Sequence, residues 1–155
     1  MTLSMFQASA PVLRHGLVTF AGVLDKAAEF AAARKIDETV LTSARLFPDM
    51  LPLSRQLQIA SDGAKGGIAR LAGVEVPRYE DTETTFEQLK ARLAKTEAFI
   101  AGFTPDQIDG SEGKTVTLQA GPTTLSFNGQ DFLLKFVLPN FYFHATTAYD
   151  ILRHN

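Results

Sequence analysis

Residues 132–149 read FLLKFVLPNFYFHATTAY and form the most apolar stretch of the chain. The stretch is long enough to raise the question of a membrane span. Four residues that are costly in hydrocarbon interrupt it: Lys135, Pro139, Asn140 and His144. Its apolar residues fall on every side of a helix, which is typical of a buried helix. We therefore expect the largely buried last helix of a helical bundle, beginning near Gly129, and no membrane span.

Helical spacing of apolar residues predicts three more long helices upstream. Capping boxes and glycines mark several of their ends, and Pro11 should kink the first helix or move its start. The expected segments are a first helix to about Arg34, a short helix over Glu38–Leu46, a second long helix with the apolar stripe Leu53–Leu71, a loop over Gly73–Glu83, and a third long helix from about Phe86 to Gly102.

Residues 114–127, KTVTLQAGPTTLSF, break the helical rhythm. Two alternating, β-branched runs flank Ala120-Gly121-Pro122, which predicts a β-hairpin. An isolated hairpin is marginal in water, so this one should pack on the helices. The expected fold class is mainly α: a four-helix bundle with a small β-hairpin before the last helix, forming a single domain over residues 1–155.

The second long helix has two unusual features. Gly63, Gly66 and Gly67 lie in its interior, where each costs about 1 kcal/mol relative to alanine. We expect the close approach of a neighbouring helix or a ligand to compensate. Arg55, Gln58, Asp62 and Lys65 lie opposite the apolar stripe. They predict either a solvated face with Gln–Asp and Asp–Lys pairs or a face turned toward a pocket.

Composition limits the classes of function. The chain has 155 residues, 45% apolar and 21% charged, which suits one globular domain. It has no cysteine, so thiol catalysis, disulfides and Cys-ligated metals are excluded. A net charge of −2 provides no general attraction for nucleic acid. Residues Met1–Ala10 have no signal-peptide pattern, and we expect a soluble, cytoplasmic protein.

The three histidines are the candidates for near-neutral chemistry. His15 shares a polar line of the first helix, and His154 lies near the terminus, so both are expected at the surface. His144 lies one turn from Asn140 within the apolar last helix. It is either a core histidine satisfied by a neighbour or a base or ligand that lines a pocket, with Tyr149 as a candidate wall.

Three segments of the chain resemble the uncharacterised DUF1993 family of the DinB/YfiT-like group. They are KIDETVLTSARLFPDM (35–50), FPDMLPLSRQLQIASDGAKGGIARLAGVEVPRYEDTE (47–83) and LPNFYFHATTAYDILRHN (138–155). The resemblance covers nearly the whole chain. It implies a DinB-like four-helix bundle, often dimeric, and no assigned reaction.

Many relatives in the wider group bind a divalent metal through three histidines. One comes from the second long helix and two from an HxxxH pair on the last helix. Here His144 matches the first member of that pair, but position 148 is alanine. The position on the second long helix falls at Gln58 or Asp62, so the resemblance implies that the metal triad is incomplete.

Three functions follow as hypotheses. The first is binding of a small molecule, without metal, in a pocket between the second and last long helices, near His144 and Asn140. The second is a divalent-metal-dependent enzyme of transferase or hydrolase type, binding zinc or nickel through His144, Asp62 and His15. The third is a non-catalytic interaction protein that acts as a homodimer. No phosphate-binding, zinc-protease or nucleophile-elbow motif favours a further class.

Overall fold

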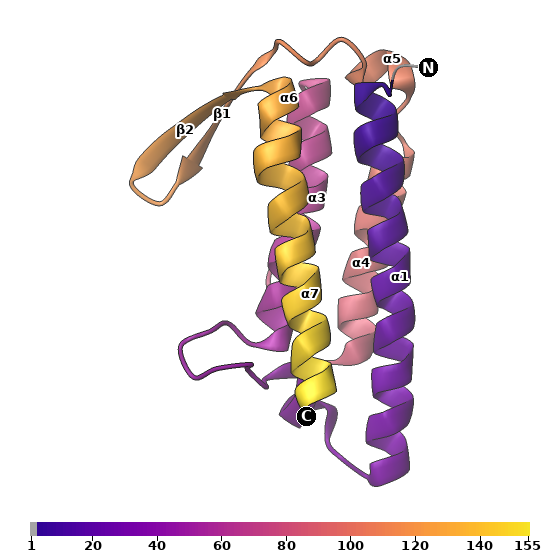
Figure 1. Cartoon of the computed structure of the whole chain (residues 1–155). Coiled ribbons are helices and arrows are strands. Elements are labelled where there is room, and N and C mark those ends of the chain that lie inside the picture. Colours follow the sequence, from indigo (N-terminus) through magenta and orange to yellow (C-terminus); the bar gives the residue numbers. More distant parts are fainter. Residues whose placement is uncertain (1–2) are drawn as a thin grey trace.

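The computed structural model describes residues 3–155, and four long helices dominate it (Figure 1). The long helices are α1 (Met5–Arg34), α3 (Leu53–Ala72), α4 (Phe86–Ala101) and α7 (Leu138–His154). The shorter elements are α2 (Glu38–Thr42), α5 (Pro105–Ile108), β1 (Thr115–Ala120), β2 (Thr123–Asn128), α6 (Gly129–Asp131) and the π-helical segment η1 (Phe132–Val137). The mainly helical fold with a hairpin before the last helix is confirmed.

The four long helices form one bundle in which α1 and α7 run one way and α3 and α4 run the other (Figure 1). The main helix pairs are α1 with α4 and α3 with α7, and α3 also packs on α4. Since α3 and α4 are parallel, the chain between them returns along the whole bundle. The core between the helices is apolar, and its largest fully buried side chains include Phe86, Phe132, Phe141, Leu13, Leu57 and Ile68.

Two expectations about the first third of the chain need correction. The short helix ends at Thr42 and not near Leu46, because the chain turns at Ser43 and then leads into the proline-flanked connection before α3. Pro11 does not move the start of α1, which begins at Met5 with a complete Ser4–Gln7 capping box.

The hairpin pairs β1 with β2 in an antiparallel register that sets Val116 opposite Phe127 and Leu118 opposite Leu125. It extends sideways from the end of the bundle (Figure 1). Val116 is buried, and the Phe127 ring packs on the rings of Phe132 and Phe136, with centroids 6.1 and 5.6 Å apart. The hairpin is therefore anchored at its base, where the last helix begins.

Pro139 lies in the last helix, and the backbone adapts just before it. Proline has no N–H to donate, and its ring crowds the preceding turn. Residues Phe132–Val137 form a wider π-helical turn, so the helix continues through Pro139 without a break. The side chain of Asn140 donates a hydrogen bond of 2.6 Å to the Phe136 carbonyl oxygen in this turn.

The expectation that the last helix is largely buried is wrong. One side of it packs on α3 and α1 through Phe141, Ala148 and Ile151. The opposite side is solvent-exposed, because α7 has neighbours on one side only. It carries three large apolar residues that are 44–55% exposed, Tyr142, Phe143 and Tyr149, and Leu134 of η1 is 48% exposed.

Only one of the three α3 glycines admits a neighbouring helix. A Cβ atom at Gly67 would lie 2.6 Å from a methyl group of Val137. At Gly66 it would meet the side chain of Arg70, and at Gly63 it would meet nothing within 4 Å. The close approach of α3 to the start of the last helix therefore depends on Gly67. No helix in the described part of the chain is long and apolar enough to cross a membrane.

Replacing Gly67 and Gly63 by alanine should have opposite effects on stability. Gly67→Ala should lower the free energy of unfolding by about 1–3 kcal/mol, because Val137 must move to admit the new methyl group. Gly63→Ala should raise it by about 0.5–1 kcal/mol, because alanine is the better helix former and the site is open. Urea unfolding of both variants measures this, and equal effects would contradict the assigned packing.

Candidate functional site

Helix α3 carries polar side chains on two different sides. Gln56 points toward α7, where it meets His144. Gln58 and Asp62 point toward α4 and the connection between α3 and α4. Since successive residues of a helix are about 100° apart, Gln56 and Asp62 cannot share one face. The two sides therefore build two separate polar centres.

The first centre is a hydrogen bond between two side chains. His144 Nδ1 lies 2.7 Å from the amide oxygen Oε1 of Gln56. The residue Gln56 is 2% exposed. The amide nitrogen of Gln56 donates to the Leu51 carbonyl oxygen at 3.1 Å, which fixes the orientation of the amide. An amide oxygen only accepts, so the proton of this bond belongs to His144 Nδ1.

Burial lowers the pKa of His144 below its ordinary value of 6.5, and the imidazole is mainly neutral at pH 7. With the proton on Nδ1, the lone pair is on Nε2. His144 Nε2 makes no hydrogen bond with the described residues. The one fully buried side-chain nitrogen or oxygen without a partner in that part of the chain is Ser111 Oγ, so Nε2 is not fully buried and is accessible to solvent. The Phe143 ring stands edge-on to the imidazole, with centroids 5.0 Å apart. His144 thus offers an oriented acceptor at the surface.

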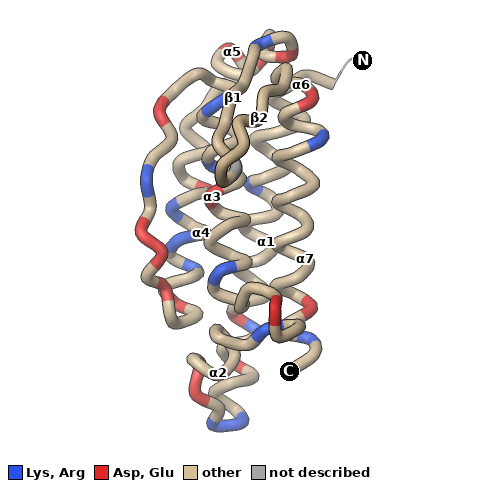
Figure 2. Tube along the Cα trace, turned by 90° about the vertical axis from the view of Figure 1, so that its left-hand side faces the viewer, with Lys and Arg blue, Asp and Glu red and all other residues tan. Residues whose placement is uncertain are grey.

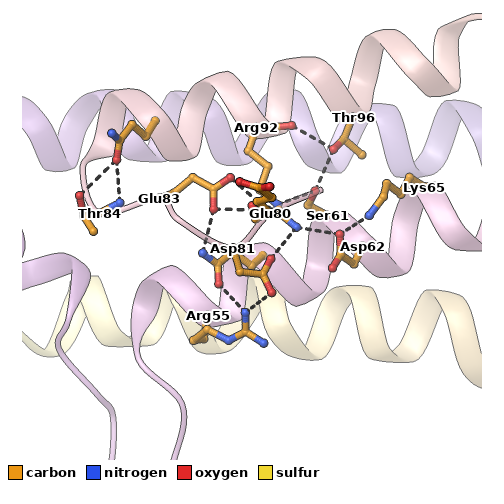
Figure 3. Close-up of polar contacts among 12 residues, drawn as sticks. Arg55, Ser61, Asp62, Lys65, Glu80, Asp81, Glu83, Thr84, Arg92 and Thr96 are labelled. Carbon is orange, nitrogen blue, oxygen red and sulfur yellow. Dashed lines mark hydrogen bonds and ion pairs between the residues drawn. The ribbon is translucent and has the colours of Figure 1, made fainter. Parts of the chain in front are cut away.

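The second centre surrounds Arg92 of α4, which is 3% exposed (Figure 3). Its Nη2 atom lies 2.7 Å from Asp62 and 3.1 Å from Asp81. Its Nη1 atom lies 3.0 Å from a Glu83 carboxylate oxygen. Nη1 also donates to the backbone carbonyl of Glu80 at 2.9 Å, and Nε donates to Ser61 Oγ at 3.2 Å. The guanidinium is therefore surrounded by acceptors from α3 and from the α3–α4 connection.

Further polar contacts extend this Arg92 network. Gln58 donates to Glu83 at 2.8 Å, Lys65 pairs with Asp62, and Arg55 pairs with Asp81. The ring of Tyr79 lies against three cations, with Lys65 Nζ, Arg92 Cζ and Lys95 Nζ at 4.3, 5.5 and 4.1 Å from its centroid. The connection that carries Tyr79 and the acidic residues runs along the outside of the bundle, with charges of both signs along it (Figure 2).

The network lowers the pKa of Asp81. Desolvation alone would raise this pKa, but the hydrogen bond and the charge of Arg55, with the charge of Arg92, outweigh it. In Arg92 itself desolvation is likewise outweighed by Glu83 and Asp62, which leaves the pKa of Arg92 raised. Both groups are therefore ionised in the folded protein at neutral pH, and the arrangement holds charge in place.

The five residues expected to line one pocket lie in four different surroundings. His144 pairs with Gln56, so the α3 residue opposite it is neither Gln58 nor Asp62. Gln58 and Asp62 belong to the Arg92 network. Asn140 is exposed and bonds within its own helix. Tyr149 lines a cavity of about 530 Å³ between α1 and α7, which His144 does not line.

The expectation of a solvated α3 face holds only for Arg55 and Asp62, whose side chains are 40% and 42% exposed. Gln58 and Lys65 are 2% and 4% exposed, because α4 and the α3–α4 connection cover this side of the helix. The expected Asp62–Lys65 pair is present, while Gln58 bonds Glu83 and not Asp62.

The described residues contain no cluster of three or more His, Asp or Glu side chains that could hold a metal ion. His15 is exposed on α1, and Asp62 is engaged by Arg92 and Lys65. The ligand set His144, Asp62 and His15 is therefore not assembled.

Sequence reasoning missed Gln56 and Arg92. Both carried a signal: Arg92 lies between Leu89 and Thr96 on the apolar seam of its helix, and Gln56 directly precedes the buried Leu57. A polar residue on an apolar seam predicts a buried partner. The partners themselves come from distant segments, so spacing could not identify them.

Replacing Arg92 should destabilise the protein and release the α3–α4 connection. Arg92→Met leaves three carboxylates without their common cation, and breaking a buried pair costs about 3 kcal/mol. Asp62 and Asp81 are partly exposed, which limits the loss. Urea unfolding measures it, and trypsin should cut faster after the exposed Arg78. As a control, Arg14→Met removes the exposed pair with Glu97 and should cost less than about 1 kcal/mol. Equal losses in the two variants would contradict the role of Arg92.

Comparison with known proteins agrees with this architecture. The model of the family described as "Domain of unknown function (DUF1993)" matches residues 5–155. A crystal structure of a DinB family member protein from Shewanella denitrificans is similar, with a TM-score of 0.86 and 35% identity over 97% of this chain and 85% of that chain. No curated protein matches the chain. The family match spans almost the whole chain, and the protein belongs to the DUF1993 family, with a DinB-like fold.

Proposed function

We propose that this protein binds a small organic molecule at His144, without a complete metal triad. The observation that carries the proposal is the bond from His144 Nδ1–H to Gln56 Oε1, which leaves Nε2 as a fixed acceptor that reaches solvent. A neutral imidazole held in one tautomer by a buried partner is suited to accept a proton or a hydrogen bond from a ligand.

The surroundings of Nε2 indicate the chemistry of such a ligand. Phe143 packs against the imidazole and is 55% exposed. An exposed apolar ring beside one oriented acceptor suits a molecule with an apolar body and a single hydroxyl or N–H donor.

The metal-dependent alternative is a transferase or hydrolase with zinc or nickel bound by His144 and Asp62. The free Nε2 of His144 could supply one ligand. Ala148, one turn further on, supplies none, and Asp62 faces Arg92. A tight zinc site normally takes at least three protein ligands, so the arrangement favours an organic ligand over a metal.

A second candidate function is a non-catalytic interaction protein that acts as a homodimer. The exposed side of α7 favours it, because Tyr142, Phe143 and Tyr149 leave large apolar surfaces in water. Apolar surface gathered on one helix side is typical of an interaction site.

The proposal predicts that hydroxyl-bearing probes stabilise the wild type through His144. A series of para-alkyl phenols should raise its melting temperature, while the matched methyl ethers, which cannot donate, should not. The rise should be lost in His144→Ala and kept in His15→Ala, since His15 is exposed on another helix. It should hold above pH 6.5 and decline on acidification, because protonation removes the acceptor and the folded-state pKa of His144 lies below 6.5.

Two outcomes would contradict this proposal. Binding of an organic ligand at His144 would be contradicted if the phenols stabilise His144→Ala as much as the wild type, or if they stabilise neither protein. Stoichiometric zinc or nickel in the wild type, lost in His144→Ala, would promote the metal-dependent enzyme.

The interaction hypothesis predicts a dimer that depends on the exposed side of α7. Light scattering should give twice the 16.9 kDa mass of one chain, and Phe143→Asp should shift the protein to a monomer with unchanged helix content. Leu3→Asp is the matched control, since Leu3 is 72% exposed and precedes α1. A monomeric wild type at high concentration would contradict the dimer.

A further inference from the structure

A cavity of about 530 Å³ lies at the end of the bundle where α1 and α7 terminate. The last three turns of α1, Leu41 of α2 and the final residues of α7 line it. The volume is in the range of small-molecule sites, about 300–1,000 Å³. His144 and the Arg92 network do not contribute to it, so it is separate from the site proposed above.

The floor of the cavity is apolar. Ala27 and Leu41 are buried there, while Phe30 and Tyr149 are 38% and 44% exposed. Two partly exposed aromatic rings and the half-buried Leu152 present apolar surface that would be stabilised by an apolar occupant.

The rim of the cavity is basic. Lys26, Arg34 and Arg153 line it together with His154, and no Asp or Glu of the described chain does. The guanidinium of Arg34 lies 4.5 Å from the centre of the Phe30 ring, which places a cation directly over the apolar floor. Of the acidic groups on the lining helices, Asp25 pairs with Lys90 and Glu38 accepts a hydrogen bond from the Phe86 N–H. Glu29 of α1 and Asp150 of α7 do not line the cavity.

Helix ends account for only part of this basic rim. Arg34 and Arg153 lie in the last turns of α1 and α7. Cations there balance the partial negative charge of the helix C-terminus, which is about half an elementary charge per helix. Lys26 is two turns before the end of α1, beyond the reach of that effect. The rim therefore retains positive charge that a bound anion would neutralise.

We propose that this cavity binds an amphipathic carboxylate, a molecule with one carboxylate and an apolar chain or ring. The apolar body lies against Phe30, Tyr149 and Leu152. The carboxylate meets Arg34 and Lys26, because a guanidinium and an ammonium both donate charge-assisted hydrogen bonds to carboxylate oxygens.

Decanoate tests this proposal, with 1-decanol as the uncharged molecule of the same chain length. Calorimetry on the whole chain should show decanoate binding at one site, with 1-decanol weaker by about tenfold or more. Chemical-shift changes should map to α1 and to the end of α7. The double variant Lys26→Met/Arg34→Met should lose that preference for decanoate and bind both molecules alike.

The matched control is Lys135→Met, which removes an exposed cation from the opposite end of the last helical segment. It should bind decanoate as the wild type does, and so should His144→Ala, which separates this proposal from the one at His144. Circular dichroism verifies that the double variant folds. The proposal is overturned if decanoate and 1-decanol bind the wild type equally, if Lys135→Met loses as much affinity as the double variant, or if decanoate does not bind.

Discussion

Arg92 is a buried cation, and the acidic side chains of α3 and of the α3–α4 connection are arranged to pair with it. A charge removed from water is tolerated only when it is paired and hydrogen-bonded. The partners cannot all come from one helix: Asp62 lies on α3, and Asp81 and Glu83 lie on the α3–α4 connection. The connection between the two parallel helices must therefore run along the bundle in contact with both of them.

Helix α3 separates this structural charge cluster from the candidate functional centre. Its Arg92 side is saturated, since each carboxylate there already faces at least one cation. Its α7 side holds a single neutral hydrogen bond, from His144 to Gln56, with one nitrogen still open to solvent. The arrangement therefore favours polar contact with an external molecule at His144 over Arg92, although the Arg92 network has many more ionisable groups.

Sequence periodicity was sufficient for the helices and the hairpin, because those depend on local spacing of apolar and β-branched residues. It located His144 correctly near a helix–helix contact but assigned it the wrong neighbours. Asn140 is one turn away in sequence, yet the widened turn before Pro139 engages it with Phe136. Gln56 could not be assigned, since that requires knowing which side of α3 meets α7. The burial of Lys65 depends on the path of a distant loop, which no local pattern encodes.

The proposed ligand site requires His144 to be a neutral imidazole with its proton on Nδ1 and an open Nε2. Nitrogen-15 NMR of the histidine rings, recorded across a pH titration, tests it most directly. We expect the Nδ1–H tautomer at pH 7 and a pKa below 6.5 for His144, with the tautomer preference lost in Gln56→Leu. An Nε2–H tautomer in the wild type, or a pKa above 6.5, would contradict it.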